Sequence, residues 1–128
     1  MNKFHTDGTR PEGAEIFVFG SNLAGVHGAG AAAAALNMGA EWGKGVGMQG
    51  KTYAIPTKDK EIKSLRLSQI QPYIEQFVEF TKANPDKKFF VTRIGCVLAG
   101  YKDNQVAPLF KDAVNCSFAK EWERFVAK

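Results

Sequence analysis

Residues 17–35 read FVFGSNLAGVHGAGAAAAA, and this stretch decides how the fold is interpreted. The apolar run of residues 16–19, which overlaps the start of this stretch, is typical of a strand buried on both faces. The alanines at the end of the stretch favour a helix from about His27 to Met38. Four glycines lie between positions 20 and 30. They leave two interpretations: a turn that precedes a helix, or a backbone against which a ligand lies.

Two more apolar runs predict buried strands, residues 51–55 (KTYAI) and 89–92 (FFVT). Ser68 and Gln71 have the spacing of a capping box, and the apolar residues after them repeat at helical intervals, which predicts a long helix from Ser68. The five glycines of residues 39–50 predict a flexible loop or a hairpin.

The C-terminal part predicts a helix near residues 105–114 and a last helix through Phe118, Trp122 and Phe125. Strands that alternate with helices predict a mainly parallel sheet with right-handed crossovers. The expected fold class is therefore α/β, a compact three-layer α/β/α domain over residues 1–128, with residues 1–14 as an irregular lead-in.

The composition, 45% hydrophobic and 23% charged among 128 residues, is that of a globular protein. No apolar run has the length of a membrane span, and the N-terminus lacks the apolar middle of a signal peptide, so a cytoplasmic protein is expected. Two cysteines and two histidines make a metal site or disulfide framework unexpected, and no cofactor is predicted. The net charge of +4 indicates either a mild preference for phosphate-bearing ligands or an ordinary solvated surface.

Three unusual loops follow the three predicted strands directly: residues 20–30 (GSNLAGVHGAG), 56–61 (PTKDKE) and 94–103 (IGCVLAGYKD). In parallel sheets, ligands bind at the carboxyl ends of the strands. We therefore expect these loops to gather on one edge of the sheet and to form one site.

The first loop has the chemistry of a phosphate cradle. Residues 28–31 carry no side-chain bulk, so backbone N–H groups at a helix start can approach a pyrophosphate. Close packing of a helix on the sheet is the alternative, and the better one for the alanines after Ala32. The amide of Asn22 suits either a ribose hydroxyl or a turn cap. His27 is either a phosphate donor or an exposed residue at the helix start.

In the second loop, Lys58 is a candidate for binding phosphate, for nucleophilic attack on a carbonyl carbon, or for a plain surface charge. In the third loop, Arg93 and Gly95 begin a second candidate cradle. Cys96 has no evident histidine partner for a nucleophilic role. Tyr101 suits either stacking on a sugar or packing.

Together, the segments GSNLAGVHGAGAA, YAIPTKD and VTRIGCVLAGYKDNQVAPLF resemble the macrodomain superfamily of ADP-ribose-binding modules. The pattern of Gly-Ala-Gly, a Thr-Lys after a strand, and Arg-Ile-Gly-Cys-x-Leu is most similar to a small branch that removes ADP-ribose from acidic side chains or DNA bases. Short phage and bacterial proteins belong to this type. The resemblance covers roughly residues 16–114.

The resemblance implies a site in which Asn22 contacts the distal ribose, Lys58 is the reactive lysine and Asp7 approaches the adenine. Lys58 and Asn22 are then the candidate catalytic residues of an ADP-ribosyl hydrolase. The full set of expected ligand-binding residues is Gly20, Ser21, Asn22, Ala24, Gly25, His27, Gly28, Ala29, Gly30, Ala31, Thr57, Lys58, Arg93, Gly95, Cys96, Val97, Leu98, Ala99, Gly100 and Tyr101.

The sequence departs from the branch pattern at two positions, of which one concerns catalysis and the other the width of the phosphate cradle. Ala99 stands where the branch has an aspartate, and Val97 stands where such loops often have glycine. The resemblance therefore favours binding of ADP-ribose or a related nucleotide, free or attached to protein or DNA, over hydrolysis. The alternatives are a protein that sequesters an NAD-derived or cyclic signalling nucleotide, and a protein-interaction module without nucleotide affinity. No membrane partner is expected, and the sequence does not set an oligomeric state.

Overall fold

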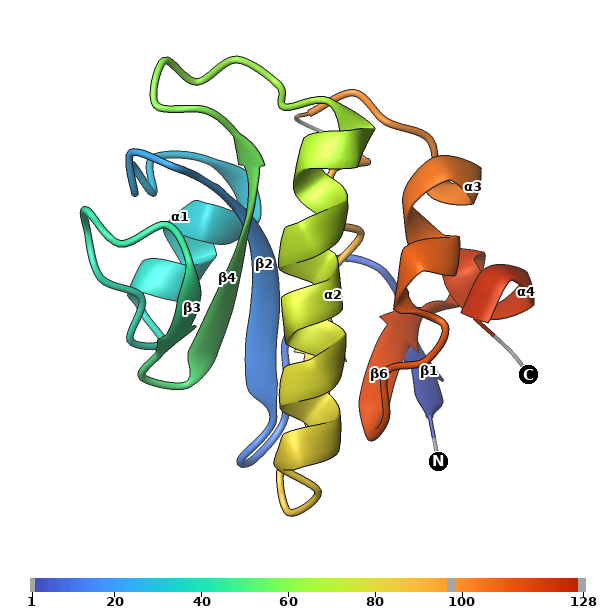
Figure 1. Cartoon of the computed structure of the whole chain (residues 1–128). Helices are drawn as coiled ribbons and strands as arrows, with labels where there is room; N and C mark the ends of the chain where they lie inside the picture. The colour runs from blue at the N-terminus through green and yellow to red at the C-terminus, as the bar shows by residue number, and fades with distance from the viewer. Residues whose placement is uncertain (1, 97–98, 127–128) are drawn as a thin grey trace.

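A six-stranded, mainly parallel sheet forms the centre of the computed structural model, which describes residues 2–96 and 99–126 (Figure 1). The strand order is β1-β6-β5-β2-β4-β3, and within the described residues only β3 runs antiparallel to its neighbour. The strands are β1 (Lys3–His5), β2 (Ile16–Asn22), β3 (Gly47–Gln49), β4 (Thr52–Lys58), β5 (Phe89–Val91) and β6 (Cys116–Ala119). The expected α/β class with a mainly parallel sheet is confirmed.

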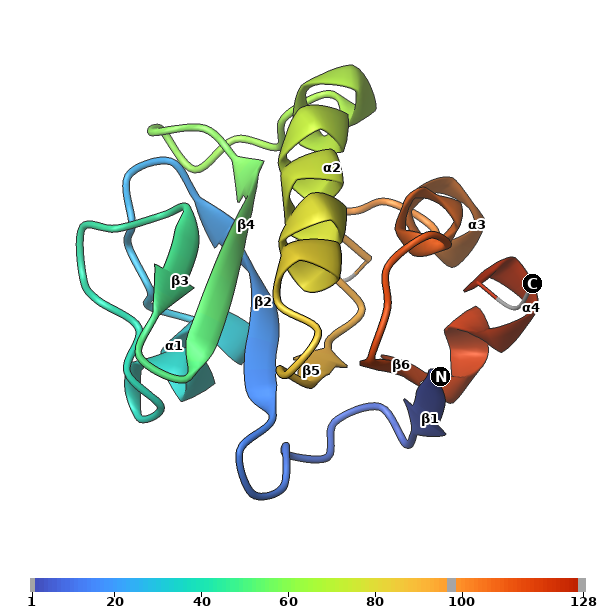
Figure 2. The same ribbon diagram turned by 60° about the horizontal axis from the view of Figure 1, so that its bottom comes forward.

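Helices lie on both faces of this sheet. Figure 2 shows α1 on one face and α2 on the opposite face. The helices are α1 (Gly30–Leu36), α2 (Leu67–Ala83), α3 (Asp103–Val106) and α4 (Glu123–Val126), with 3-10 turns η1 (Ala107–Phe110) and η2 (Lys120–Trp122). The 3-10 turn η1 packs on α2. The helical layer on the α2 face is therefore more extensive than the layer on the α1 face.

The core explains why strand β2 is continuously apolar. Successive side chains of a strand point to opposite faces. Ile16 and Val18 belong to the cluster that contains the apolar face of α2, whereas Phe17 and Phe19 pack with the alanines of α1. The strand is buried on both faces, as its sequence predicts.

Helix α1 is shorter than the predicted residues 27–38. Ala29 is extended, with φ −151° and ψ 158°, and Gly30 has φ +59°, so the helix begins only at Gly30. It packs on β2, and the N-terminal segment after β1 runs along the other half of this sheet face (Figure 2). Part of the face is therefore covered by an irregular segment instead of a helix.

The capping box predicted for Ser68 and Gln71 is wrong. The long helix α2 begins at Leu67, and the N–H of Arg66 donates to Oε1 of Gln69 at 2.9 Å. A glutamine three residues after the N-cap can make this contact, and the sequence offers the same spacing twice.

The predicted C-terminal helices are also wrong in part. The helix near residues 105–114 is a single turn, α3, that continues as the 3-10 turn η1, where Pro108 has no N–H to donate. Phe118 lies in β6, paired in parallel with β1 and β5, and helix α4 begins only at Glu123. The spacing of Phe118, Trp122 and Phe125 resembles that of a helix, but pairing of β6 with a strand on each side places Phe118 in the sheet.

Of the two alternatives for residues 39–50, the structure has the hairpin, with β3 antiparallel to β4. Its glycines permit close backbone contact. A Cβ atom on Gly39 would lie 2.8 Å from Cα of Gly50, and one on Gly45 would lie 2.0 Å from the carbonyl oxygen of Asn22. Both are closer than a side chain allows. Gly39 therefore permits close contact within the hairpin segment, and Gly45 permits contact between the hairpin and the first loop.

Candidate functional site

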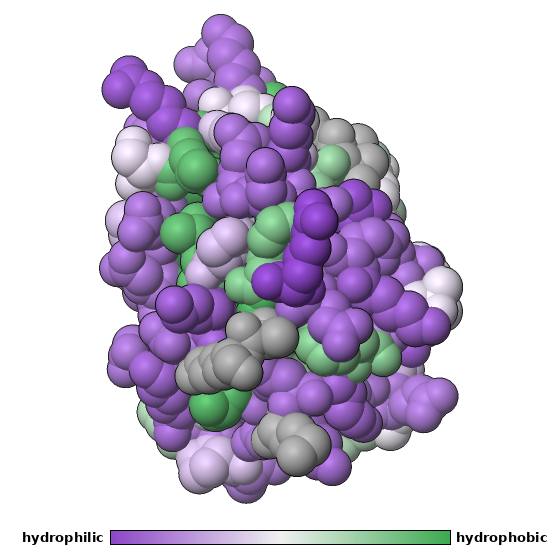
Figure 3. Space-filling model, turned by 90° about the vertical axis from the view of Figure 1, so that its right-hand side faces the viewer, coloured by the Kyte–Doolittle hydropathy of each residue, from purple (hydrophilic) through white to green (hydrophobic). Residues whose placement is uncertain are grey.

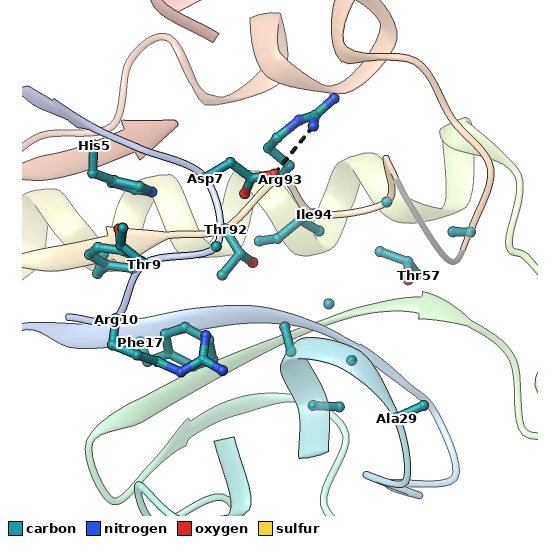
Figure 4. Close-up of a pocket in the computed structure, with 18 residues that line it drawn as sticks. His5, Asp7, Thr9, Arg10, Phe17, Ala29, Thr57, Thr92, Arg93 and Ile94 are labelled. Atoms are coloured by element: carbon teal, nitrogen blue, oxygen red, sulfur yellow. Dashed lines mark hydrogen bonds and ion pairs between the residues drawn. The ribbon is translucent and has the colours of Figure 1, made fainter. Parts of the chain in front are cut away.

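A cavity of about 390 Å³ opens at the carboxyl ends of β1, β2 and β5 (Figure 4). Its walls come from the N-terminal segment, the start of α1 and the loop after β5. The lining residues are His5, Asp7, Gly8, Thr9, Arg10, Phe17, Gly20, Ala29, Gly30, Ala31, Ala32, Thr57, Phe90, Thr92, Arg93, Ile94, Gly95 and Ala99. We refer to this cavity as the main pocket, and its volume lies in the range of small-molecule sites, about 300–1,000 Å³.

One end of the main pocket is aromatic. His5 stacks on Phe90 with ring centroids 3.8 Å apart and an interplanar angle of 15°, and its Nδ1 lies 2.8 Å from Oγ of Ser117. Burial lowers the pKa of His5, against the opposing effect of nearby acids, so the neutral ring is favoured. Figure 4 shows Thr9, Arg10 and Phe17 at this same end. Planar rings beside a guanidinium offer a flat aromatic group a place to bind.

The opposite end of the main pocket has almost no side-chain bulk. Gly20, residues 29–31 and Gly95 bring main chain to the cavity surface. Gly95 has φ +78°, which a side chain rarely adopts, whereas Gly20 has an ordinary φ and room for a Cβ. Thr57 adds a hydroxyl group. Such a wall allows a polar ligand to approach backbone N–H groups.

A second, smaller cavity of about 170 Å³ adjoins this end. It shares four lining residues with the main pocket, namely Gly20, Ala29, Ala32 and Thr57. The remaining lining residues are Ser21, Asn22, Val26, Gly28, Lys58 and Ile62. The two cavities therefore adjoin at the carboxyl edge of the sheet. We refer to the smaller one as the second pocket and to the two together as the cleft.

Lys58 and Asn22 both line the second pocket but differ in availability. Within residues 2–96 and 99–126, the ammonium group of Lys58 has no hydrogen-bond or ion-pair partner. The amide of Asn22 is occupied: Nδ2 donates to the carbonyl of Val26 at 2.8 Å, and Oδ1 accepts from the N–H of Val26 at 2.9 Å. Of the two roles expected for Asn22, the structure shows the turn cap.

Arg93 lines the main pocket, but its guanidinium is already paired with acids. Nε and Nη2 donate to the two carboxylate oxygens of Asp103 at 3.0 and 2.7 Å, and Nη1 donates to Asp7 at 3.3 Å. The hydrogen bonds to Asp103 and, to a smaller extent, Asp7 raise the pKa of Arg93. The hydrogen bond from Arg93 lowers the pKa of Asp103. Arg93 thereby ties the N-terminal wall of the cleft to α3, instead of presenting a free cation to phosphate.

His27 is fully buried, neither exposed nor lining either pocket. Its Nε2 lies 2.8 Å from the carbonyl oxygen of Glu41 and 3.1 Å from that of Lys44, so this nitrogen carries the proton. Its ring meets Phe19 and Trp42 edge-on. Nδ1 has no partner among the described residues. His27 thus holds the hairpin loop on the first loop.

The remaining expected residues of the first loop are structural. Gly25 has φ +69°, and a Cβ there would lie 2.2 Å from the backbone of Gly43, so it is needed for close contact between two loops. Oγ of Ser21, which lines the second pocket, donates to the carbonyl of Gly45. Ala24 and Gly25 line neither pocket.

The third loop is fastened to the segment that follows β4. The hydroxyl of Tyr101 donates to the carbonyl of Leu65, and Oγ of Ser64 donates to the carbonyl of Ala99 at 2.9 Å. Tyr101 therefore packs, and, like Gly100 and Cys96, it lines neither pocket. Burial raises the pKa of the Cys96 thiol to about 12, which leaves it protonated near neutral pH. Val97 and Leu98 lie outside the described residues.

The expected site thus divides into residues that line the cleft and residues that support it. Those that line it are Gly20, Ser21, Asn22, Gly28, Ala29, Gly30, Ala31, Thr57, Lys58, Arg93, Gly95 and Ala99. Sequence reasoning missed the aromatic end, formed by His5, Thr9, Arg10, Phe17 and Phe90. Its only local signal was a turn-rich segment next to a short strand. Whether any of these residues contacts a ligand stays a prediction.

Comparison of the chain with protein-family models, curated proteins and solved structures gave no match. The likeness to macrodomains therefore stays a prediction. No helix among the described residues combines the length and apolar character needed to cross a membrane.

Proposed function

We propose that the protein binds a nucleotide that contains a diphosphate group, with ADP-ribose as the first candidate, in the cleft formed by the main and second pockets. The observation that carries this proposal is that the two pockets adjoin, with Gly20, Ala29, Ala32 and Thr57 lining both. An aromatic end, a bulk-poor middle and a small second pocket follow one another in this cleft. That order matches a base, a diphosphate and a distal group.

The electrostatics of the cleft support an anionic ligand. Arg10 and Lys58 lie near its two ends, and neither has a hydrogen-bond or ion-pair partner in the part of the chain that the structure describes. Between them, a ligand can approach the backbone wall without meeting large side chains. A diphosphate held there would be flanked by both cations, in agreement with the net charge of +4.

A surface view argues against the protein-interaction alternative on one side of the molecule. The face that carries α3 and α4 is mostly hydrophilic, with hydrophobic residues in small separate areas (Figure 3). Interfaces between proteins usually have an apolar centre. On this side, the described surface has the character of one that faces solvent.

Hydrolysis of an ADP-ribosyl linkage is a second candidate function, favoured by the partner-free ammonium of Lys58 in the second pocket. The nearby carboxylates are engaged elsewhere. Asp59 accepts from the N–H groups of Glu61 and Lys63, and Asp103 accepts from Arg93 and Trp122. Ala99 supplies no acid in the main pocket. We therefore propose binding as the primary function, in a cytoplasmic protein whose Cys96 and Cys116 are free thiols.

Calorimetry with ADP-ribose, NAD, AMP and a cyclic nucleotide tests binding. Ala29 is exposed and lines both pockets, so Ala29→Phe should fill the cleft and abolish the heat of ADP-ribose binding. Ala83→Phe, at an exposed alanine outside both pockets, should leave it unchanged. Absence of binding by the wild-type protein at millimolar nucleotide would refute the proposal.

Turnover of an ADP-ribosylated protein or DNA oligonucleotide tests the second candidate. Lys58→Ala should abolish release of ADP-ribose, whereas Lys60→Ala, at an exposed lysine two positions away, should not. Equal turnover by both variants would remove Lys58 from the mechanism. Binding without any turnover would leave the primary proposal standing.

A further inference from the structure

Ile62 has a backbone conformation that its side chain disfavours. Its φ is +64°, in the left-handed region, where β-branched residues are genuine outliers. Among the described residues, the other positions with positive φ are glycines and Asn115, the residue types that tolerate it. The chain thus keeps an isoleucine where glycine or asparagine would be more stable. Strain of this kind is frequent at ligand clamps.

Hydrogen bonds of Asp59 fix the strained loop. Oδ1 of Asp59 accepts from the N–H groups of Glu61 and Lys63 at 2.9 and 3.0 Å, and its own N–H donates to the carbonyl of Lys63 at 2.8 Å. A bridge between Lys58 and Ser64 closes the loop at its base. Ile62 is therefore held in place at the tip of a short, well-bonded turn.

The side chain of Ile62 is not used for the core. It is 44% exposed and lines the second pocket, as does Val26, which is 39% exposed. Val26 comes from the first loop and Ile62 from the turn that continues the second loop, so two segments each contribute one exposed, β-branched residue to the same small cavity. Exposed apolar side chains at a cavity gain stability only when a ligand covers them.

The second pocket is large enough for a small cyclic group. A cavity of about 150 Å³ accommodates a molecule the size of benzene. The 170 Å³ of the second pocket therefore offer room for one ring. A free terminal phosphate would lose hydration against Val26 and Ile62, and only Lys58 would offer it a charge.

Resting on the proposed function, we infer that Val26 and Ile62 form a specificity clamp for an uncharged ring attached to the far end of the diphosphate. The protein then discriminates between nucleoside diphosphates that carry such a ring and those that end in a free phosphate. The strain at Ile62 is retained because its side chain covers the ring.

A ligand series on the intact protein tests this discrimination. We expect ADP-ribose to bind about tenfold more tightly than ADP, because apolar contact with the ring is added and desolvation of a free phosphate is avoided. Equal binding of ADP and ADP-ribose, or tighter binding of ADP through Lys58, would overturn the inference while the proposed function stands. If neither nucleotide binds, the proposed function itself fails and takes this inference with it.

Two variants separate the clamp from a merely structural loop. Ile62→Asn should raise the melting temperature by about 4 °C, because asparagine tolerates the left-handed conformation, and should reduce the ratio of ADP-ribose to ADP affinity to near one. Val26→Ala should lower this ratio, whereas Val46→Ala should not, since Val46 is exposed to a similar degree, 37%, but lines neither pocket. An unchanged ratio in Ile62→Asn would overturn the clamp, whatever the melting temperature.

Discussion

Arg93 and Asp103 form a two-point ion pair, with Nε–Oδ1 and Nη2–Oδ2 distances of 3.0 and 2.7 Å. The same carboxylate accepts from Nε1 of Trp122 at 2.8 Å, and the same guanidinium reaches Asp7. These contacts join four parts of the chain: the loop after β5, the first turn of α3, the 3-10 turn η2, and the N-terminal wall of the main pocket.

Replacing Arg93 by lysine should destabilise the protein, because an ammonium group cannot make the two parallel hydrogen bonds of a guanidinium. The pair is about three-quarters buried, and we expect a loss of about 1–2 kcal/mol in the free energy of unfolding, measured in urea. Arg66→Lys, at an exposed arginine, is the control. Equal losses in the two variants would contradict the importance of the pair.

The ion pair also predicts a loss of stability in acid. The hydrogen bond from Arg93, assisted by that from Trp122, lowers the pKa of Asp103 below its unfolded value of about 3.9. Its contribution is therefore fully present above about pH 4 and is lost as the pH falls through the folded pKa. Urea unfolding between pH 6 and 2.5 should show a steeper acid decline for the wild-type protein than for Asp103→Asn. Parallel profiles would exclude this role.

His5 predicts a second decline, at higher pH. Burial lowers its pKa, although Asp7, Glu15 and Glu121 act in the opposite direction. The unfolded chain then takes up a proton before the folded one does, so stability falls as the pH drops from about 6.5 towards the folded pKa. His5→Phe keeps a ring for the stack on Phe90 and removes the titration. Its unfolding free energy should change less between pH 7.5 and 5 than that of the wild type, and an identical change would refute the assignment.

Gly45 and Gly28 should respond in opposite ways to alanine. A Cβ on Gly45 would lie 2.0 Å from the carbonyl oxygen of Asn22, so Gly45→Ala must displace backbone, at a cost of about 2 kcal/mol or more. A Cβ on Gly28 meets only Val26, at 4.0 Å, and Gly28→Ala should stabilise the chain by about 0.5 kcal/mol. Thermal unfolding of both variants measures the difference, and equal melting temperatures would contradict it.

The sequence predicts the buried central strands of the sheet but neither β1 nor β6. Strands β2, β4 and β5 are recognisable because burial on both faces demands continuous apolar runs. Strand β1 is as short as β5 but is not buried along its length, and β6 follows a spacing that also fits a helix, so only pairing between distant segments defines them. Local sequence carries little information about such pairing.

The same limit applies to the candidate site. Loops that directly follow the recognised strands line the cleft, as the topology predicts, and Gly20, Ala29 and Lys58 are among their residues. The aromatic end depends on β1 and on contacts between His5 and Phe90, 85 positions apart by residue number, which no local pattern reveals. The pairing of Arg93 with Asp7 was equally hidden, because folding brings these two residues together from distant parts of the chain. For Asn22, by contrast, the turn cap with Val26 was one of the two predicted roles.

Helix α1 is short and covers only one half of its face of the sheet. The N-terminal segment covers the other half, where His5 stacks on Phe90. A nucleotide in the main pocket would lie against this face beside α1 and would act as part of that layer. Occupancy should then slow hydrogen exchange of backbone amides in β1 and β5 more than in β3, at the far edge of the sheet.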